Sequence, residues 1–554
     1  MYATTGGDIA GAVYFSPNAG NMWYNIGTAL PNVPMNTVVI DPNDTNLIFV
    51  GTDVGLFRGT HSGGTPGTWA WCAYNVGLPK TALVKGLAVH RETGTLRAFT
   101  YGRSAWEVKA FGVADIDTKV NVGANPVTDV QPPLISSNFY GGGSRFGVAW
   151  RDDRNGANNW RAYFRAYTNT GGSISAINAT EVLAALGSQQ IESLAFSAHP
   201  TLATSVYCGR FAWHDKRLNG VNPHVFSQYT CSDGWTLWTD DLRVDTHALS
   251  SNAKNPAIVT QNGGTNLDFA VAWEFGNTTR KIYGRFFTWA GTAKSVPTYG
   301  TNSFPVSTSA LDATAPAIAG NSTGEVIVAW QERASASSDY IYARKYTRDG
   351  VPLTAAVRID SGAIANRGEV SIGFDSNNKT VIAWSEATTG QPRRVISVGC
   401  PASSGLTCYA LDGSCRRCVG GSQAGVGCAS DGDCSGGVCG TAGTVSCGPR
   451  IAQVGSETAQ FPSVAADGSA NVVVTWQGSP TDGSANPKMN AMAKSFNVWA
   501  LAAKSDFRVD RADRADVRSP VATRGAQAKE FVYAWRDNRA GHFDVYLRKV
   551  ASLP

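Results

Sequence analysis

One short strand pattern recurs along most of this chain and constrains its fold more than any other feature. Apolar residues are followed by Ala or Thr and then by Trp, and this pattern occurs seven times. The copies are FGVAW ending at Trp150, RFAW at Trp213, AVAW at Trp273, VIVAW at Trp330, VIAW at Trp384, VVVTW at Trp476 and FVYAW at Trp535. Successive Trp residues are 63, 60, 57, 54, 92 and 59 positions apart. Such regular spacing indicates a repeat protein in which each unit packs against its neighbours.

Each copy has companion strands at matching offsets. A Pro followed by small and apolar residues lies upstream, as at Pro256, Pro316, Pro462 and Pro520. An alternating strand such as IYGRFF or IYARKY follows, and a short strand such as LRVD or VRID comes last. Four strands in a unit of roughly 55 residues are typical of a β-propeller blade, and propellers have about four to eight blades. We therefore predict an all-β chain with a seven-bladed β-propeller over residues 111–554, in which the repeated Trp is a core residue.

Residues 1–110 contain two related units of a different kind. LPNVPMNTVVIDPNDTNLIFVGTDVGLF and LPKTALVKGLAVHRETGTLRAFTYGRSAW align Leu30 with Leu78 and Phe57 with Trp106. Just before the first unit stands SPNAGNMW, residues 16–23. This segment resembles the Asp-box, the Ser-x-Asp-x-Gly-x-x-Trp turn of sialidase-like and sortilin-like BNR propellers, with Asn in place of the usual Asp. The resemblance implies a structural turn in which the amide caps backbone N–H groups and the Trp packs below.

The same resemblance implies that residues 1–110 are two C-terminal blades of a partial BNR-type propeller. Two blades cannot bury both of their flanks, so we expect further blades upstream, in a longer exported protein. The seven later repeats resemble the Ala-Trp-x-Asp-x-Arg-x-Gly repeats of secreted bacterial propeller proteins, a group that brings no established activity. CVGGSQAGVGCASDGDCSGGVC is likewise similar to the small Cys/Gly repeats of such exported proteins.

A Cys-rich stretch occupies the long interval between the fifth and sixth copies. It contains eight of the 11 cysteines, Cys400, Cys408, Cys415, Cys418, Cys428, Cys434, Cys439 and Cys447. This Gly/Ser/Asp-rich stretch has few apolar residues to bury and needs covalent links to hold a shape, so we predict a disulfide-rich insert over residues 400–447. Zinc is the alternative, because Cys415 and Cys418 have ligand spacing. The other intervals are irregular and the segment contains no His, which favours disulfides.

A second pair of cysteines lies in SVYCGRFAWHDKRLNGVNPHVFSQYTCS. A hairpin centred on LNG places Cys208 opposite Cys231, and cross-strand neighbours lie close enough to be bridged. Cys72 then remains without a partner, and we expect it to be buried beside Trp71. Disulfides form in oxidising compartments, so we expect an extracellular or cell-surface protein.

The charge distribution argues against a nucleic-acid partner, and the hydropathy argues against a membrane-spanning helix. The formal net charge of +5 is spread over 554 residues without a run of Lys or Arg that could neutralise a row of phosphates, so we expect no nucleic-acid partner. No stretch approaches the roughly 20 apolar residues of a membrane-spanning helix, so we expect no transmembrane segment. A glycan or an extracellular protein is the partner that we expect.

Acidic residues recur beside the repeated Trp. Five lie two residues after it and one lies directly after it: Asp152, Asp215, Glu332, Glu386 and Asp537, and Glu274. If this turn opens on the ligand funnel, paired carboxylates there could hydrolyse glycosidic bonds or hold calcium. In WRDDRNG, WHDKRLNG and WRDNRAG, however, an Arg follows the acid by two residues, which favours a local ion pair that caps the turn. Catalysis needs one unique constellation, whereas five blades share this acid, so we favour the structural role. No complete calcium motif occurs, and we expect no cofactor.

Aromatic and histidine side chains supply further candidates. Trp160, Trp235, Trp238, Trp289 and Trp499 fall outside the repeated position. Trp on a loop offers a stacking face for a sugar ring, and Trp235 and Trp238 in CSDGWTLWTDD are the best candidates because they follow the Cys208 hairpin. His214 and His224 flank that hairpin and are the pair that could approach each other as metal ligands.

Two functional hypotheses remain. The sequence lacks a His-Glu-x-x-His motif, a phosphate-binding loop and the Arg-Ile-Pro motif of sialidases. We favour a non-catalytic secreted or cell-surface protein that binds glycans or proteins through its propeller faces, because the specific motifs are structural. The alternative is a polysaccharide-active glycoside hydrolase or lyase with a site in the propeller funnel, which rests mainly on analogy of fold.

Overall fold

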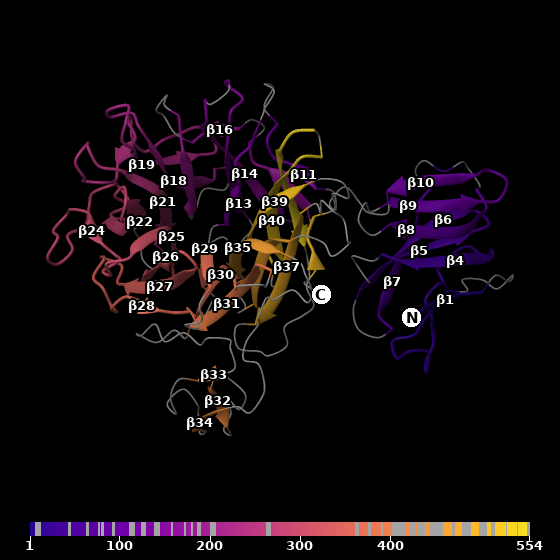
Figure 1. Ribbon diagram of the computed structural model, residues 1–554. Coiled ribbons are helices and arrows are strands. Elements are labelled where there is room, and N and C mark those ends of the chain that lie inside the picture. Colours follow the sequence, from indigo (N-terminus) through magenta and orange to yellow (C-terminus); the bar gives the residue numbers. More distant parts are fainter. Residues whose placement is uncertain are drawn as a thin grey trace. The chain divides into compact units, whose positions relative to one another are not determined.

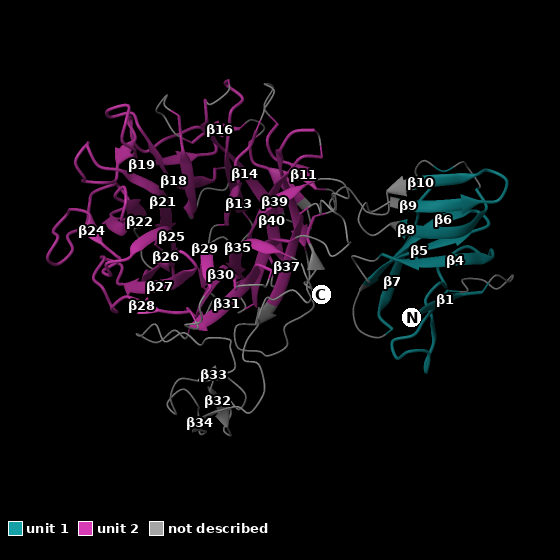
Figure 2. Ribbon diagram, viewed as in Figure 1, with its two compact units in different colours: residues 1–116, 511–513 teal, residues 117–510, 514–554 magenta. Residues whose placement is uncertain are grey.

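The computed structural model divides the chain into two compact units, residues 1–116 with 511–513, and residues 117–510 with 514–554 (Figure 2). It describes residues 1–5, 13–41, 46–62, 66–75, 78, 82–90, 95–109, 117–122, 129–137, 145–156, 159–170, 173–178, 181–184, 190–199, 206–261, 267–360, 365–374, 378–388, 392–400, 416–419, 427–428, 438–441, 458–467, 471–478, 489–497, 507–510, 516–527, 529–539 and 541–550. These residues form strands and no helix, so the described chain is all-β, and none of it could cross a membrane as a helix.

The first unit contains three antiparallel sheets within its described residues. Their strands are β1 (Tyr2–Thr4), β2 (Val13–Phe15) and β3 (Tyr24–Asn25); β4 (Met35–Ile40), β5 (Leu47–Thr52), β6 (Gly55–Ser62) and β7 (Thr68–Ala73); and β8 (Val84–His90), β9 (Thr95–Thr100) and β10 (Ala105–Lys109). The two aligned sequence units form the second and third sheets, with Phe57 on β6 and Trp106 on β10. Equivalent residues therefore occupy equivalent strands.

Two local details of this unit can be compared with what the sequence led us to expect. Asn18 accepts a hydrogen bond from the Met22 N–H at 2.8 Å, as the Asp-box resemblance implies, and the Trp23 ring lies beside Gly20 of the turn while 42% of Trp23 stays exposed. Cys72 is exposed, so the expectation of a buried thiol beside Trp71 is wrong. Successive side chains of a strand point to opposite faces, and on β7 Trp71 is half-buried whereas Cys72 points outward.

The described residues of the second unit form eight sheets, seven of which lie around a common centre (Figure 1). The inner strands are β12 (Leu134–Ser137), β17 (Ser193–His199), β21 (Ala253–Thr260), β25 (Asp312–Gly320), β29 (Asn366–Phe374), β35 (Ala459–Ala466) and β39 (Val517–Arg524). The second strands are β13 (Arg145–Asp152), β18 (Cys208–Asp215), β22 (Phe269–Phe275), β26 (Val326–Ser335), β30 (Thr380–Ala387), β36 (Asn471–Gly478) and β40 (Phe531–Asp537). The third strands are β14 (Arg161–Thr170), β19 (His224–Cys231), β23 (Lys281–Phe287), β27 (Ser338–Tyr346), β31 (Arg394–Cys400), β37 (Asn490–Asn497) and β41 (Asp544–Val550).

Short outer strands complete most of these sheets. They are β16 (Val182–Leu183), β20 (Leu242–Arg243), β24 (Phe304–Pro305), β28 (Val357–Arg358) and β38 (Phe507–Arg508), and β15 (Ser173–Ala176) pairs with the far end of β14. The last sheet takes its outer strand, β11 (Thr118–Lys119), from the chain before the first sheet. Asn121 strengthens this closure, because its side chain donates to Asp544 and accepts from the Val545 N–H, each at 2.8 Å. The ring is therefore closed, and the seven-bladed β-propeller is confirmed.

The seven repeated Trp residues are the core of the ring. Each lies on the second strand of its sheet and is at most 1% exposed. Trp150 packs against Val532 and Ala534 of the last blade, and Trp273 packs against Ala212 of the blade before it. The indole thus buries apolar surface between adjacent blades, as the sequence predicts.

The predicted insert is described only in part. Three short strands, β32 (Arg416–Val419), β33 (Gly427–Cys428) and β34 (Val438–Thr441), form a small antiparallel sheet. Cys400 at the end of β31 is disulfide-bonded. The side chains of the other seven cysteines of the insert lie outside the described residues, so their pairing stays a prediction.

Candidate functional site

The acids that follow the repeated Trp are buried, and their first partner is the Trp itself. In five blades the indole N–H donates to the acid two residues later: Trp150 to Asp152 at 2.9 Å, Trp213 to Asp215 at 3.0 Å, Trp330 to Glu332 at 2.8 Å, Trp384 to Glu386 at 3.5 Å and Trp535 to Asp537 at 2.9 Å. The two remaining blades carry Phe275 and Gly478 at that position. In those blades the Nε1 atoms of Trp273 and Trp476 have no hydrogen-bond partner among the described residues. The acid is therefore the acceptor for a buried indole donor.

The predicted ion pair between the acid and the Arg two residues later is present. Arg217 binds Asp215 through Nη2 at 2.6 Å and through Nε at 2.9 Å, and the Arg217 N–H donates to the same carboxylate at 3.0 Å. Arg154 and Arg539 bind Asp152 and Asp537 in the same way. Each guanidinium also lies over an aromatic ring of the third strand, at about 4 Å from the ring centre. These carboxylates are held by the turn that they cap.

The three glutamates have other partners. Glu386 accepts from Arg367 at 2.8 Å and from Arg394 at 2.9 Å. Glu332 accepts from the Ser309 hydroxyl at 2.6 Å. Glu274 accepts at 2.9 Å from the N–H of Ala315, a residue with a positive φ of 51° in the next inner strand. Glu274 thus stabilises a strained bulge of the neighbouring blade.

A central cavity of about 330 Å³ lies at the opposite end of the strands from these acids. It is lined by the C-terminal ends of all seven inner strands and by the residues that follow β25. Glu332 pairs with Ala313 at the start of β25, whereas Ile318–Gly320 at the end of that strand line the cavity. None of the six acids is among the described residues that line it. The expectation that they open on the ligand funnel therefore does not hold for this cavity.

His214 and His224 do not approach each other. They belong to adjacent cross-strand pairs of β18 and β19, His214 with Val225 and Asp215 with His224, so their side chains lie on opposite faces. His224 binds Asp245 at 3.1 Å. Among the residues described here, no group of His, Cys, Asp and Glu is placed to hold a metal. The suggestion of a metal site at these two histidines is thus not supported.

His214 has a structural role instead. Its Nδ1 atom accepts the N–H of Asn255 at 3.1 Å, and Asn255 has a positive φ of 49° in the next inner strand. Its Nε2 atom binds Glu192 at 3.2 Å. Burial lowers the pKa of His214 to about 4, so the imidazole is neutral and Nδ1 can accept.

Two exposed tryptophans lie on loops of adjacent blades. Trp235 is 52% exposed on the loop after β19, and Trp289 is 43% exposed on the loop after β23. We call these two side chains the aromatic surface. Trp238, the other Trp that the sequence singles out, is half-buried and donates from Nε1 to the Ala290 carbonyl at 3.1 Å. Trp238 therefore links the two loops, while Trp235 presents a ring to solvent.

A buried arginine lies beneath the aromatic surface. Arg210 is 0% exposed, and its Nη2 atom donates to the Trp289 carbonyl. Its guanidinium carbon lies 4.1 Å from the centre of the Phe269 ring, 5.1 Å from Tyr229 and 5.5 Å from Trp238. Burial lowers the pKa of Arg210 to about 9. Arg210 thus holds together the two loops that carry the exposed rings.

Sequence reasoning missed Arg210, although a signal was available. Arg210 stands three residues before Trp213, where the other six copies have Gly147, Ala270, Ile327, Val381, Val473 and Val532. A charged residue at a position that is otherwise small or apolar marks this blade as different from the rest.

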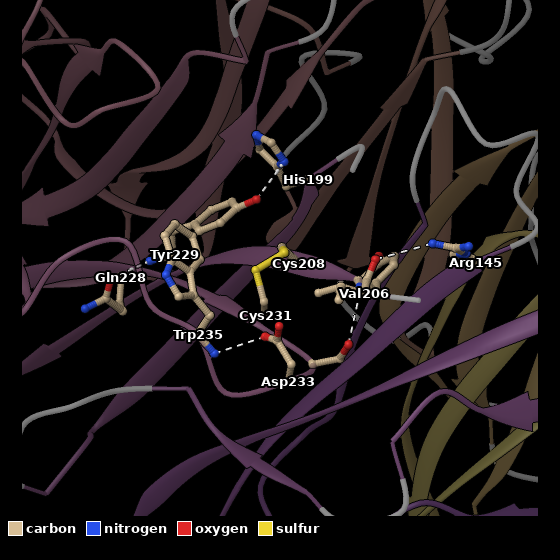
Figure 3. The surroundings of a disulfide bond; sticks show 11 residues. Arg145, His199, Val206, Cys208, Gln228, Tyr229, Cys231, Asp233 and Trp235 are labelled. Atoms are coloured by element: carbon tan, nitrogen blue, oxygen red, sulfur yellow. Dashed lines mark hydrogen bonds between the residues drawn. A yellow bond between two sulfur atoms is a disulfide. The ribbon is translucent and has the colours of Figure 1, made fainter. Parts of the chain in front are cut away.

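The disulfide between Cys208 and Cys231 is present, as the hairpin predicts. It joins the first residue of β18 to the last residue of β19, and the loop to Trp235 begins there (Figure 3). The Cys231 N–H donates to the Trp235 carbonyl at 2.9 Å, and the ring of Tyr229 meets that of Trp235 edge-on at 5.9 Å. The covalent bond therefore fixes the base of the loop that carries half of the aromatic surface.

No protein-family model matches this chain, and no curated protein matches it. Solved structures that resemble it include a Hadza microbial sialidase, 10% identical over 82% of this chain and 73% of the sialidase, with a TM-score of 0.36. A leech intramolecular trans-sialidase is 10% identical over 92% of this chain and 90% of its own, with a TM-score of 0.35. A Dyadobacter fermentans protein of unknown function is 11% identical over 79% and 98%, with a TM-score of 0.38. Likenesses this distant assign neither activity nor substrate, and the propeller fold rests on the strand pairing of this chain.

Proposed function

We propose that this chain is a non-catalytic secreted or cell-surface protein that binds glycans through the aromatic surface of its propeller. The observation that carries the proposal is the exposure of Trp235 and Trp289 on adjacent loops that a buried arginine holds together. Flat, exposed indole rings stack on the apolar faces of sugars, and a fixed ring loses little conformational entropy on binding. An extracellular protein would meet glycans in the compartment where the Cys208–Cys231 disulfide is stable.

Binding without catalysis is favoured by the state of the carboxylates. Glycoside hydrolysis needs two carboxyl groups that flank a sugar. Asp152, Asp215 and Asp537 are each 0% exposed and are bound by an indole and a guanidinium. A carboxylate with these partners has neither the access nor the free lone pairs that an acid or a nucleophile requires. The alternative, a polysaccharide hydrolase or lyase, would need a different pair of acids.

Retention on polysaccharides, measured together with product release, tests this proposal. The purified protein would be passed over a panel of immobilised polysaccharides, and new reducing ends or unsaturated products would be assayed in parallel. We expect retention on at least one polysaccharide without any product. Product from a single polysaccharide would overturn the proposal and favour the hydrolase or lyase.

Single substitutions locate the binding surface. Trp235→Ala and Trp289→Ala should each weaken retention by about tenfold or more, the usual effect of removing an aromatic anchor. Trp23→Ala is the matched control, because Trp23 is 42% exposed in the first unit and should leave retention unchanged. Equal retention by all three variants would place the glycan site elsewhere.

A further inference from the structure

The main chain beneath the two exposed tryptophans is held in place. The Trp235 N–H donates to Asp233 Oδ1 at 3.0 Å (Figure 3). The Trp289 N–H donates to Asp268 Oδ1 at 3.1 Å, and the Trp289 carbonyl accepts from the Arg210 guanidinium. A ring whose backbone is already fixed loses little conformational entropy when a ligand stacks on it. Both rings of the aromatic surface are therefore prepared for binding before a ligand arrives.

The two loops that carry these rings are in direct contact. Trp238 on the first loop donates from Nε1 to the carbonyl of Ala290 on the second at 3.1 Å. Gly291 has a positive φ of 91°, and a Cβ atom there would lie 2.6 Å from Cζ2 of Trp238, so this position accepts only glycine. Arg210 on β18 donates to the Trp289 carbonyl across the same boundary. The distance between the two exposed rings is therefore set by packing between the blades.

The two exposed rings are separate positions on this surface. Within the described residues, the ring of Trp235 contacts that of Tyr229 at 5.9 Å, and Trp289 makes no ring contact. The contacts that lead from one indole to the other pass through Tyr229 and Arg210, whose guanidinium carbon lies 5.1 Å from the Tyr229 ring. Aromatic pairs in contact have their centres about 4.5 to 7 Å apart, so the two indoles are not such a pair. A sugar that stacks on one indole leaves the other available for a second sugar.

Both exposed indoles keep an N–H group that the protein does not use. Nε1 of Trp238 donates to Ala290, whereas Nε1 of Trp235 and of Trp289 donates to no residue in the described part of the chain. An exposed indole stacks on the apolar face of a sugar and donates from its N–H to a sugar hydroxyl. The two rings therefore offer the same kind of contact at two places.

We propose that the aromatic surface binds a linear glycan chain along its length, with one sugar on Trp235 and a later sugar of the same chain on Trp289. This inference rests on the function proposed above and adds the class of ligand, an oligosaccharide segment instead of a single sugar. Once the first ring is occupied, the second contact is intramolecular and does not pay again for lost translational freedom. Affinity should therefore rise with the length of the chain until both rings are covered.

Calorimetric titration with fragments of graded length tests the inference. The fragments would be prepared from the polysaccharide that retains the protein, as single sugars, disaccharides and longer pieces up to about the octasaccharide. The longest fragments should bind at least about tenfold more tightly than the shortest, with one fragment per protein chain. Equal affinity at all lengths, or two long fragments per chain, would overturn the inference while the proposed function stands. If no polysaccharide retains the protein, the proposed function is wrong and this inference with it.

Substitutions assign the length dependence to the two rings. Trp289→Ala should weaken binding of the longest fragments about tenfold or more, to the level of the short ones, and Trp235→Ala should do the same. Trp289→Phe keeps a ring and should retain most of the length dependence. Trp23→Ala is the control and should bind every fragment like the wild type. A Trp289→Ala variant in which all fragment lengths lose the same factor would show that one sugar contacts both rings, which contradicts a chain that spans them.

Discussion

The structural role of the repeated acids can be tested most directly at Asp215. Asp215→Asn keeps the size of the side chain and removes its charge. In the wild type the carboxylate is 0% exposed and accepts from Trp213, from the Arg217 backbone and from the Arg217 guanidinium. The amide cannot satisfy all of these donors, because its own NH2 group would face a guanidinium. The substitution therefore leaves buried donors without an acceptor.

The expected loss of unfolding free energy depends on the partners that Arg217 keeps in the variant. Breaking one side of a buried ion pair costs about 3 to 5 kcal/mol of unfolding free energy. Arg217 keeps a second carboxylate, Asp241, at 2.7 Å, so we expect about 3 kcal/mol, at the lower end of that range. The Arg217 guanidinium thus loses the carboxylate of Asp215 and keeps that of Asp241.

Urea unfolding followed by far-UV circular dichroism measures this loss. Asp240→Asn is the control, because Asp240 is exposed on the neighbouring loop and its substitution should change the unfolding free energy by less than about 0.5 kcal/mol. If Asp215→Asn were as stable as the control, the carboxylate would not be committed to the turn. An unchanged stability together with the loss of a polysaccharide-cleaving activity would establish a catalytic role and refute our reasoning.

Three further predictions concern protonation, ring closure and the disulfide. Burial lowers the pKa of His214 from 6.5 to about 4, so below pH 6.5 the unfolded chain binds a proton that the folded chain does not. The unfolding free energy should therefore fall between about pH 6.5 and 4, by at most about 3 kcal/mol from this group. Urea unfolding at several pH values measures this loss, and a His214→Gln variant with the same pH dependence as the wild type would contradict it. Asn121→Ala removes two buried hydrogen bonds at the ring closure, so it should lower the unfolding free energy by about 2 kcal/mol and lower the midpoint of thermal unfolding. A midpoint equal to that of the wild type would show that these bonds beside β11 do not stabilise the closed ring. Replacing Cys208 and Cys231 together by Ser opens a loop with a sequence separation of 23 and should cost about 3 kcal/mol in urea unfolding, and full stability in the double variant would exclude a stabilising role.

The sequence determined the features of this protein that repeat within one blade. A strand that ends in Ala-Trp recurs with its companion strands, and each copy forms the same sheet because the alternation of apolar residues is local to the unit. The position of Cys208 opposite Cys231 follows from the symmetry of a single hairpin. The ion pair between Asp215 and Arg217 spans only two residues, so it too could be read from the chain.

The tertiary structure decided whatever depends on contacts between blades. Arg210 binds the carbonyl of Trp289, which lies 79 residues away, and this contact creates the aromatic surface that the sequence only suggested through separate tryptophans. The cavity exists because seven inner strands, the first and last of them nearly 400 residues apart, end at one place when β11 closes the ring. His214 and His224 are neighbours in one hairpin, yet the strand register sends them to opposite faces. Local spacing specifies strands and turns, but ring closure sets which blades meet and therefore which side chains share a site.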